Sequence, residues 1–407
     1  MKFWHTLQQI KNSTDSSWLA INVLVAIVIS LSLGQLGRLY IGNVVVYPHD
    51  ALISVWLLIE SRTVASIIAS LQSTNYKKHL SEYLLLAWVL IGMLVSYVIT
   101  RDPLPWLYAV RLTIYLLFLV TVFKKFKNYS LLLRTAIIVI GSIMVMAGFI
   151  QYFYIPDTRF LFTQGWDEHY YRLIGTLLDP NYTGLVLIIT GWAVFSYRKY
   201  IAKRLENTTI LIFLIGIAFT YSRATYLALV VSIMGYIFFN WWKSRKFSRT
   251  AVLSILAMIV IVGTAIILAP KPGGEGVDLL RTTSITARYT TSAEFLTTLQ
   301  PWQWITGAGF YTRPVEIHDL TSHAKVPDNL LVFVLYSTGI VGVILTSWSG
   351  IKLSKYIATK NEVLLPVTAA LLTHAQFNNS LLEPFVFLIG GILITGLVAD
   401  KETSRYT

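Results

Sequence analysis

The 407-residue chain contains no cysteine. This absence excludes disulfide bridges, thiolate nucleophiles, zinc–thiolate sites and iron–sulfur clusters together. Charge is also scarce, because Asp, Glu, Lys and Arg make up 13% of the residues, whereas 55% are hydrophobic and the mean hydropathy is +0.62. Soluble domains carry about 25% charged residues. The composition therefore excludes a water-soluble protein and indicates an integral membrane protein.

Apolar runs long enough to cross a bilayer recur along the chain. A hydrocarbon core of roughly 30 Å needs about 20 apolar residues in a helix, and we find about twelve such runs. The sequence therefore predicts an all-α polytopic membrane protein of about 12 transmembrane helices, with residues 1–407 forming a single integral membrane domain. The expected helix centres are Ala26, Val55, Val89, Leu116, Val145, Ile188, Phe213, Val231, Val260, Leu335, Thr368 and Ile389.

The basic surplus divides between the two sides of the membrane. Lys and Arg number 33 against 20 Asp and Glu, a net charge of +13, which favours cytoplasmic loops and anionic lipid over nucleic acid as partners. Alternation through twelve spans with both termini in the cytoplasm places nearly all lysines inside. Nine arginines fall on the outer side and need another explanation: Arg38, Arg101, Arg111, Arg159, Arg172, Arg223, Arg281, Arg288 and Arg313.

Two outer segments are longer than a connection requires. A smaller loop covers residues 155–181 and a large loop covers residues 269–328. Within the large loop, Ser284–Leu299 has apolar residues at helical spacing, which predicts a helix. Long ordered loops in compact proteins are usually lids or binding elements. We therefore expect functional residues in both loops.

Two polar stretches adjoin helices on the outer side. Arg172 precedes the turn Asp179-Pro-Asn181, and Tyr221-Ser-Arg223 lies at a tight reversal between two apolar runs. Asp179 and Asn181 either cap a helix or bind a ligand oxygen. Arg223 either extends to the lipid headgroups or pairs with an anion, and Arg111 presents the same alternatives.

Two further stretches carry histidine or carboxylate. Gly307-Ala-Gly309 is followed by His318, Asp319 and His323, and then by Asp328-Asn329 before an apolar run. The spacing of the two histidines does not match a helical ligand pair, so the sequence predicts no metal site and no cofactor. His374 lies with Asn378 on one face of a later helix, close to Glu383, and either a structural hydrogen bond or a catalytic role suits it.

Arginine on the outer side favours an anionic ligand with phosphate oxygens, because its planar guanidinium always carries charge and binds such groups in pairs. Aromatic residues of the two loops, such as Trp166 and Tyr311, offer flat surfaces for sugar rings, although interfacial aromatic belts occur without any ligand. The combination indicates a site for an anionic, lipid-linked sugar.

At these residues the chain resembles the O-antigen ligase and Wzy-type O-antigen polymerase superfamily. The matching features, in chain order over roughly residues 130–400, are Arg172-Leu-Ile-Gly-Thr with Asp179-Pro-Asn181, Tyr221-Ser-Arg223-Ala, Gly307-Ala-Gly309-Phe, Asp328-Asn329-Leu-Leu with Gly339-Ile-Val-Gly342, and His374 to Asn379. Each motif is short, and their order in one topology gives the set its specificity.

The resemblance implies a metal-independent glycosyltransferase that acts on an undecaprenyl-pyrophosphate-linked oligosaccharide at the outer face of the cytoplasmic (inner) membrane. Family ligases generally carry a histidine where this chain has Asp328. That departure favours a polymerase of lipid-linked repeat units, with an O-antigen ligase acting on lipid A core or another acceptor as the alternative. A lipid-linked glycan transporter without chemistry is the competing class. Membrane lipids and a chain-length regulator protein are further expected partners.

The same resemblance suggests roles for individual residues. Asp328 is the first candidate for the general base, with His323 and His374 in reserve, and Arg172 and Arg223 are expected to grip the pyrophosphate. The residues expected to bind substrate are Arg111, Arg288, Arg313, Arg281, Asn181, Asn329 and Tyr221.

Overall fold

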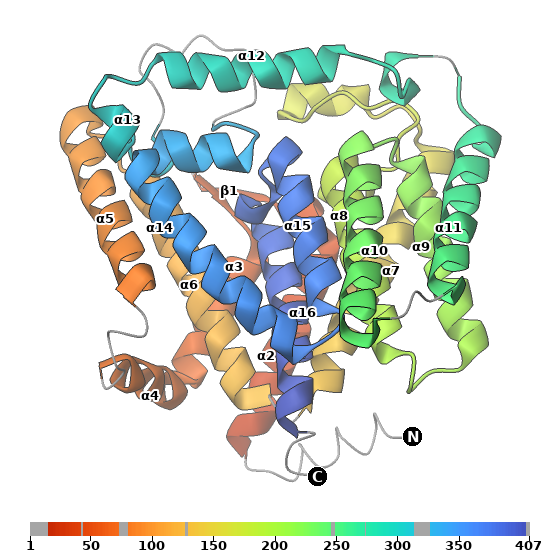
Figure 1. Ribbon diagram of the computed structural model, residues 1–407, viewed down its shortest axis with the longest axis horizontal. Helices are drawn as coiled ribbons and strands as arrows, with labels where there is room; N and C mark the ends of the chain where they lie inside the picture. The colour runs from red at the N-terminus through yellow and green to blue at the C-terminus, as the bar shows by residue number, and fades with distance from the viewer. Residues whose placement is uncertain are drawn as a thin grey trace.

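The computed structural model describes residues 15–41, 44–72, 80–126, 129–245, 249–272, 274–312 and 326–403. The described chain is mostly helical (Figure 1). Its first half contains α2 (Asp15–Leu33), α3 (Pro48–Ile59), α4 (Ser61–Gln72), α5 (Leu80–Thr100), α6 (Leu104–Phe126), α7 (Ser130–Tyr154) and α8 (Pro180–Tyr197). Its second half contains α9 (Lys203–Phe219), α10 (Arg223–Ser244), α11 (Arg249–Leu268), α12 (Thr283–Thr297), α13 (Gln303–Thr306), α14 (Leu330–Lys360), α15 (Leu364–Asn378) and α16 (Pro384–Thr403).

Every predicted span centre lies inside one of these helices, but the prediction of twelve spans is not confirmed. Among the described residues, six helices are long and apolar enough to cross a membrane, or up to seven if the bent pair α3 and α4 forms one span. Shorter apolar helices account for part of the difference, such as Leu256–Leu268 and Pro384–Ala399. A long apolar run indicates a helix, but it does not show that the helix crosses the membrane, because a helix buried among other helices is also apolar.

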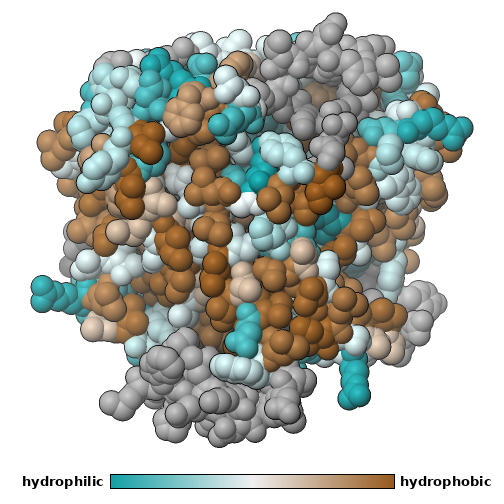
Figure 2. Space-filling model, turned by 180° about the vertical axis from the view of Figure 1, so that it is seen from behind, coloured by the Kyte–Doolittle hydropathy of each residue, from teal (hydrophilic) through white to brown (hydrophobic). Residues whose placement is uncertain are grey.

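The exposed surface agrees with a membrane environment. On the face shown in Figure 2, hydrophobic residues gather over most of the middle of the molecule, and hydrophilic residues are more frequent toward its edges. Large apolar side chains on α5 are well exposed, including Leu86, Val98 and Ile99. An exposed apolar area of this extent is unusual in a soluble monomer. The coarse prediction of a helical, polytopic membrane protein is thus supported.

The two ends of the helix bundle differ. At the lower end in Figure 1, α2 begins and α16 ends. There, Arg134 donates from Nη1 to the Ser196 carbonyl at 3.0 Å, and Arg198 pairs with Glu362 at 3.0 Å. At the upper end, α12 lies across the tops of the other helices. The predicted loop helix at Ser284–Leu299 is confirmed by α12, whose ends differ by one or two residues.

A small antiparallel hairpin, which the sequence did not predict, lies beside the helices. Strand β1 (Leu39–Ile41) pairs with β2 (Val44–Val46), with Leu39 opposite Val46. β-Branched residues favour extended structure, and two strands this short give too weak an alternation to be recognised in the sequence. The register brings Arg38 and Tyr47, the residues that flank the hairpin, to the same end of it.

Close helix crossings hold the centre of the bundle. The core joins α2, α3, α6, α7, α8, α15 and α16 through buried residues such as Ile140, Leu187 and Leu393. On α8, a Cβ added at Gly184 would lie 2.6 Å from the Thr225 side chain of α10. Small residues at such crossings let helices approach closely in membranes. Gly184 therefore fixes where α10 begins relative to α8, at the upper end.

Candidate functional site

A cavity of about 570 Å³ opens at the upper end, and we call it the upper cavity. It lies among the hairpin, the starts of α3 and α6, the segment before α14 and the turn between α15 and α16. Its charged lining residues are Arg38, Asp50, Arg111, Asp328 and Glu383. Its aromatic lining residues are Tyr47, Tyr108, Tyr115, Trp166, Tyr182 and Tyr311. Concave sites with a few charges among aromatic rings are typical ligand sites.

Arg111, a predicted substrate-binding residue, lines this cavity but is already engaged. Its Nη2 donates to the Val45 carbonyl and to Oδ2 of Asp50, both at 2.7 Å. Asp50 also accepts a 2.5 Å hydrogen bond from the Tyr115 hydroxyl. The ion pair neutralises much of the Arg111 charge, so this arginine joins the hairpin to α3 and α6 as well as facing the cavity.

Arg38 is the second arginine of the upper cavity, and no carboxylate within the described part of the chain pairs with it. Its guanidinium carbon lies 4.7 Å from the Tyr40 ring centroid and 4.9 Å from that of Trp166. Its Nε is buried without a hydrogen-bond partner in the same part of the chain. The stacked rings hold a charged guanidinium with donors available to an anion.

Two carboxylates face the upper cavity. Burial raises the pKa of Asp328, and the nearby Arg288 opposes that rise. Burial also raises the pKa of Glu383 to about 7 against the effect of backbone N–H donors at the start of α16. One of these, the amide of Val386, donates to Oε2 at 2.8 Å. A carboxylate with a raised pKa inside a cleft is suited to proton transfer near neutral pH.

Arg223 and Arg281 lie outside the upper cavity and hold the large loop. Arg223 donates from Nη1 to the Leu279 and Arg281 carbonyls and from Nη2 to Oγ of Ser284 at 2.7 Å. Arg281 donates from Nη1 to the Gly276 and Asp278 carbonyls at 2.9 and 2.8 Å. These bonds fix the loop before α12 onto the start of α10. Together with Arg172 we call these residues the arginine junction.

Arg172 is almost completely buried within this junction. Its Nε donates to the Thr220 carbonyl at 2.9 Å, and its Nη2 lacks a hydrogen-bond partner within the described ranges. Burial and the neighbouring Arg281 lower its pKa to about 10, so the guanidinium is still charged at neutral pH. A buried, charged donor without a partner is costly unless a ligand or water satisfies it.

Arg288 on α12 lies between the arginine junction and the upper cavity. Its Nη2 donates to Oδ1 of Asn378 at 2.8 Å, and its Nε lies 4.0 Å from Oδ2 of Asp328. Both of those partners line the upper cavity. The helix of the large loop thus contributes a charge to the cavity's edge.

Other predicted binding residues have structural contacts. The Asn329 side chain caps α14 by accepting from the Val332 amide at 3.0 Å and donates to the Gln376 carbonyl. Asn181 accepts from the Ser222 hydroxyl at 2.7 Å, and Tyr221 is buried at a left-handed backbone position. His374 is buried, with Nδ1 3.1 Å from Oγ of Ser380. Arg313 and His323 lie outside the described residues.

The glycine motif has a packing role. Gly309 donates from its amide to the Ser337 carbonyl at 3.1 Å, where α14 is kinked at Gly339. A Cβ at Gly307 would lie 2.4 Å from the Ser337 backbone. Backbone approach this close requires glycine. The motif therefore seats the end of the large loop against the α14 kink.

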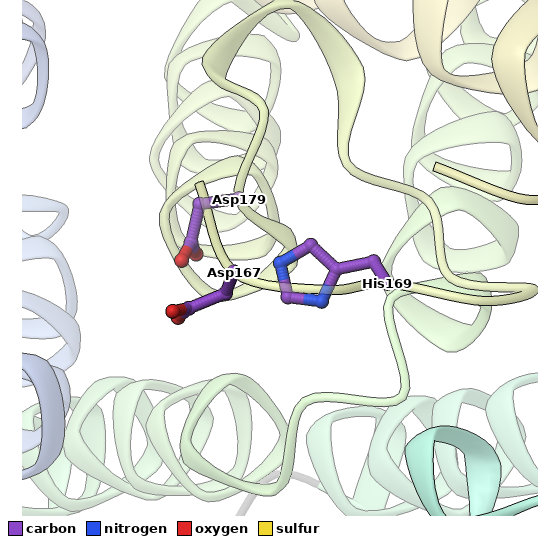
Figure 3. A group of neighbouring side chains, drawn as sticks. All are labelled: Asp167, His169 and Asp179. Atoms are coloured by element: carbon purple, nitrogen blue, oxygen red, sulfur yellow. The ribbon is translucent and has the colours of Figure 1, made fainter. Parts of the chain in front are cut away.

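Sequence reasoning missed most of the upper cavity and one further group. The sequence indicates Arg38 only as one of the outward arginines, and no motif marks Asp50. A group of possible metal ligands, Asp167, His169 and Asp179, also lies together, with their ligand atoms all within 4.8 Å of one another (Figure 3). The signal available in the sequence was the Asp167-x-His169 pair in the smaller loop, but nothing marked its approach to Asp179.

The fold and this site define a class of protein: a polytopic helical membrane protein with a charged, aromatic cavity at one end. A family model described as O-antigen ligase matches residues 208–347, about a third of the chain. Over these residues the match confirms the resemblance to the O-antigen ligase and Wzy-type polymerase superfamily. No curated protein matches the chain. The apolar helices and the family match together indicate a multi-pass protein of the inner membrane.

Proposed function

We propose that the protein is a glycosyltransferase that polymerises undecaprenyl-pyrophosphate-linked oligosaccharide repeat units at the outer face of the inner membrane. The observation that carries the proposal is the upper cavity, which combines a guanidinium without a carboxylate partner among the described residues, two carboxylates of raised pKa and aromatic rings. The family match supports an enzyme of this superfamily.

The orientation follows from the charges at the two ends. At the lower end, Lys125 pairs with Glu60 at 2.9 Å and Lys203 with Glu206 at 3.0 Å. The arginines of the upper cavity and of the arginine junction gather at the upper end. Because the basic residues of short loops are retained inside and lysine is the residue that is unevenly distributed here, we infer that the lower end and both termini are cytoplasmic. The upper cavity then faces the compartment where the lipid-linked donor is displayed.

The donor's pyrophosphate belongs next to Arg38 in this proposal. A sugar linked to pyrophosphate at its anomeric carbon reacts when charge developing on the leaving oxygen is stabilised. Arg38 supplies a positive guanidinium that can stabilise this negative charge, and Arg111 adds a second guanidinium, held by Asp50. The stacked rings of Tyr108 and Tyr311, with centroids 4.4 Å apart, supply an apolar wall against which sugar rings pack.

Asp328 is the proposed general base. It makes no close hydrogen bond among the described residues, and its nearest cation is Arg288 at 4.0 Å, so its oxygens are free for a substrate hydroxyl. Glu383 is less free, because Oε2 caps α16. In the reaction, the acceptor hydroxyl oxygen bonds to the anomeric carbon and its proton passes to Asp328. The bond from that carbon to the pyrophosphate breaks, and the electron pair leaves with undecaprenyl pyrophosphate.

The arginine junction has an indirect role in this scheme. Arg223 and Arg281 fix the loop that carries α12, and α12 brings Arg288 to Asp328. Arg172 supports the same region and keeps one donor atom for an anion. A chain-length regulator, although expected from the resemblance, draws no support from the family match.

Polymerisation is favoured over ligation by one residue. Family ligases generally carry histidine at the position of Asp328, and this chain carries a carboxylate that borders the upper cavity. A ligase would join one finished glycan to a lipid or another acceptor, whereas a polymerase extends the glycan repeatedly.

The experiment uses purified protein in liposomes that contain defined lipid-linked repeat units. A ladder of products, each longer by one repeat, is the expected result. A single conjugate with an added acceptor would assign a ligase instead. If the lipid moves to the other leaflet and no glycosidic bond forms, the protein is a transporter. The matched control for residual activity is the Asp328→Asn protein.

A further inference from the structure

The smaller loop and the start of α8 bring together three side chains that the reaction above does not use. Asp167 and His169 follow the 3-10 turn η3 (Arg159–Gln164), and Asp179 is the N-cap residue of α8. In Figure 3 the His169 ring extends toward two carboxylates that lie side by side. Each of the three residues offers one ligand atom, a ring nitrogen or a carboxylate oxygen, and these three atoms all lie within 4.8 Å of one another.

His169 is the observation that points to a ligand. Only 5% of the residue is exposed, and neither Nδ1 nor Nε2 has a hydrogen-bond partner within the described part of the chain. A buried imidazole without any partner is costly. Its backbone is held firmly, because the amide and hydroxyl of Thr158 both donate to the His169 carbonyl, at 3.0 and 2.9 Å. The ring is therefore positioned while its two nitrogens remain available.

The carboxylates are also arranged for a cation. Asp179 accepts from the amides of Asn181 and Tyr182 with Oδ1, at 2.6 and 2.9 Å. Its Oδ2 makes no bond among the described residues and is free to ligate. Asp167 is exposed and lies close enough to Asp179 for the two negative charges to repel. A cation between them would remove that repulsion.

We propose that Asp167, His169 and Asp179 bind a divalent transition-metal ion of the Zn²⁺ type, which joins the smaller loop to the start of α8. Imidazole with carboxylates suits Zn²⁺ better than Mg²⁺ or Ca²⁺, which take oxygen ligands. For all three ligand atoms to bind one ion at about 2.0–2.2 Å, the distances between them would have to shorten by at most about 1.5 Å. Three protein ligands leave a coordination position for water or a substrate oxygen.

The surroundings set the charge balance of this site. Burial lowers the pKa of His169, and the charges of Arg172 and Arg281 act in the same direction. The neutral imidazole is the form that ligates metal. With an ion bound, two carboxylates balance its charge, and the two guanidiniums leave a net positive region at the upper end. The ion and Nη2 of Arg172, which has no hydrogen-bond partner among the described residues, would together favour an anionic ligand.

The test is zinc binding by the purified full chain without a histidine tag. Protein in detergent is treated with chelator, desalted, loaded with ZnCl₂ and passed through gel filtration, and the retained zinc is measured by atomic emission. We expect one zinc per chain. In Asp167→Asn and His169→Gln, the affinity for zinc should fall at least about tenfold. Loss of a residue that only supports a metal ligand already lowers metal affinity by about that factor.

Matched controls separate this site from other ligands and from misfolding. Asp157→Asn changes an exposed carboxylate of the same loop, paired with Arg159 at 2.6 Å, and should keep the zinc. ZnCl₂ should raise the melting temperature of wild type and of Asp157→Asn but not of His169→Gln, while MgCl₂ should raise none of them. Because Asp167 is exposed, its variant tests the site even if the His169 variant does not fold. Zinc lost in His323→Gln but retained in Asp167→Asn, or no zinc in wild type, would overturn the proposal.

Discussion

The upper cavity and the arginine junction both contain arginine, but they use it differently. In the arginine junction, Arg172, Arg223 and Arg281 donate to backbone carbonyls of loops. In the upper cavity, Arg38 lies against two aromatic rings and Arg111 pairs with Asp50. The guanidinium suits both tasks, because its five donors form a rigid fork and its plane stacks on rings.

The difference shows which arginines are available to a substrate. A guanidinium whose donors are satisfied by loop carbonyls positions the loop, and a ligand would have to displace those bonds. Arg38 has no such bonds among the described residues, so an anion can use its donors without displacement. Both terminal nitrogens of Arg223 are engaged by the large loop, whereas Arg172 keeps one donor without a partner among the described residues. The expectation that these two arginines grip the pyrophosphate stays a prediction, and Arg38, outside any recognised motif, becomes the first candidate for direct contact.

The largest expected effect belongs to Asp328→Asn in the upper cavity. Loss of a general base should lower the rate of glycan transfer by about 10²–10⁴-fold, while the amount of protein in the membrane stays constant. The measurement is the initial rate with defined lipid-linked repeats in liposomes. Asp102→Asn is the control, because Asp102 lies at the α5–α6 connection, and an amide there can still accept from the Leu104 amide. A rate within a few-fold of wild type would exclude Asp328 as the base.

Arg38→Gln should produce the next largest effect. A hydrogen bond to a charged group contributes about 1.5–3 kcal/mol, so its loss should raise KM for the lipid-linked donor roughly 10- to 100-fold. The control is Arg159→Gln, an exposed outer arginine whose partner is Asp157. If Arg38→Gln lowers protein abundance but leaves KM unchanged, Arg38 has a structural role and the contrast between the two regions fails.

Arg223→Lys sharpens the contrast from the other side. Lysine keeps the charge but cannot reproduce the bonds to two carbonyls and Ser284, so the large loop should loosen and glycan chain extension should fall by about tenfold. Product length on gels and the rate of proteolysis within residues 274–297 are the two measurements. We expect shorter products together with faster cleavage.

Arg204→Lys, at the exposed start of α9, is the matched control for that variant. Short products with unchanged proteolysis would mean that Arg223 contacts the substrate directly, as the sequence motif first suggested. A normal distribution of polymer lengths in Arg223→Lys would contradict any role of Arg223 in chain extension.

The sequence predicted the helices well and the site only in part. Long apolar runs identify helices because burial and lipid both demand them. Lysine placement predicts that Asp328, Arg111 and Arg288 lie on one side of the membrane, and the structure brings all three to the upper end. The upper cavity could not be inferred, because Arg38, Asp50 and Glu383 come from segments far apart in the chain. Only packing brings them together, and periodicity within one segment carries no information on such contacts.

The count of twelve spans is left unconfirmed for a related reason. Apolar character alone does not separate a helix that crosses lipid from one enclosed by other helices, and α8 is largely buried within the bundle. The cluster at His169 was missed in the same way, since its third member lies ten residues further on, beyond the η4 turn (Gly175–Leu177).

The smallest expected effect is a pH dependence of stability caused by Glu383. Its pKa is raised from 4.5 to about 7 in the folded chain, so between these values the folded protein keeps a proton that the unfolded chain releases. Stability of the wild type should therefore fall as pH rises through that window and change little above it. Glu383→Gln removes this ionisation, and its amide oxygen can still accept from Val386. The melting temperature of the variant relative to wild type should rise by a few degrees from pH 5 to pH 8. The reason is that the variant is spared the cost of ionising a buried carboxyl, about 1 kcal/mol of the free energy of unfolding. A difference that stays constant over this range would mean that the Glu383 carboxyl is not desolvated, and that water reaches it through the upper cavity.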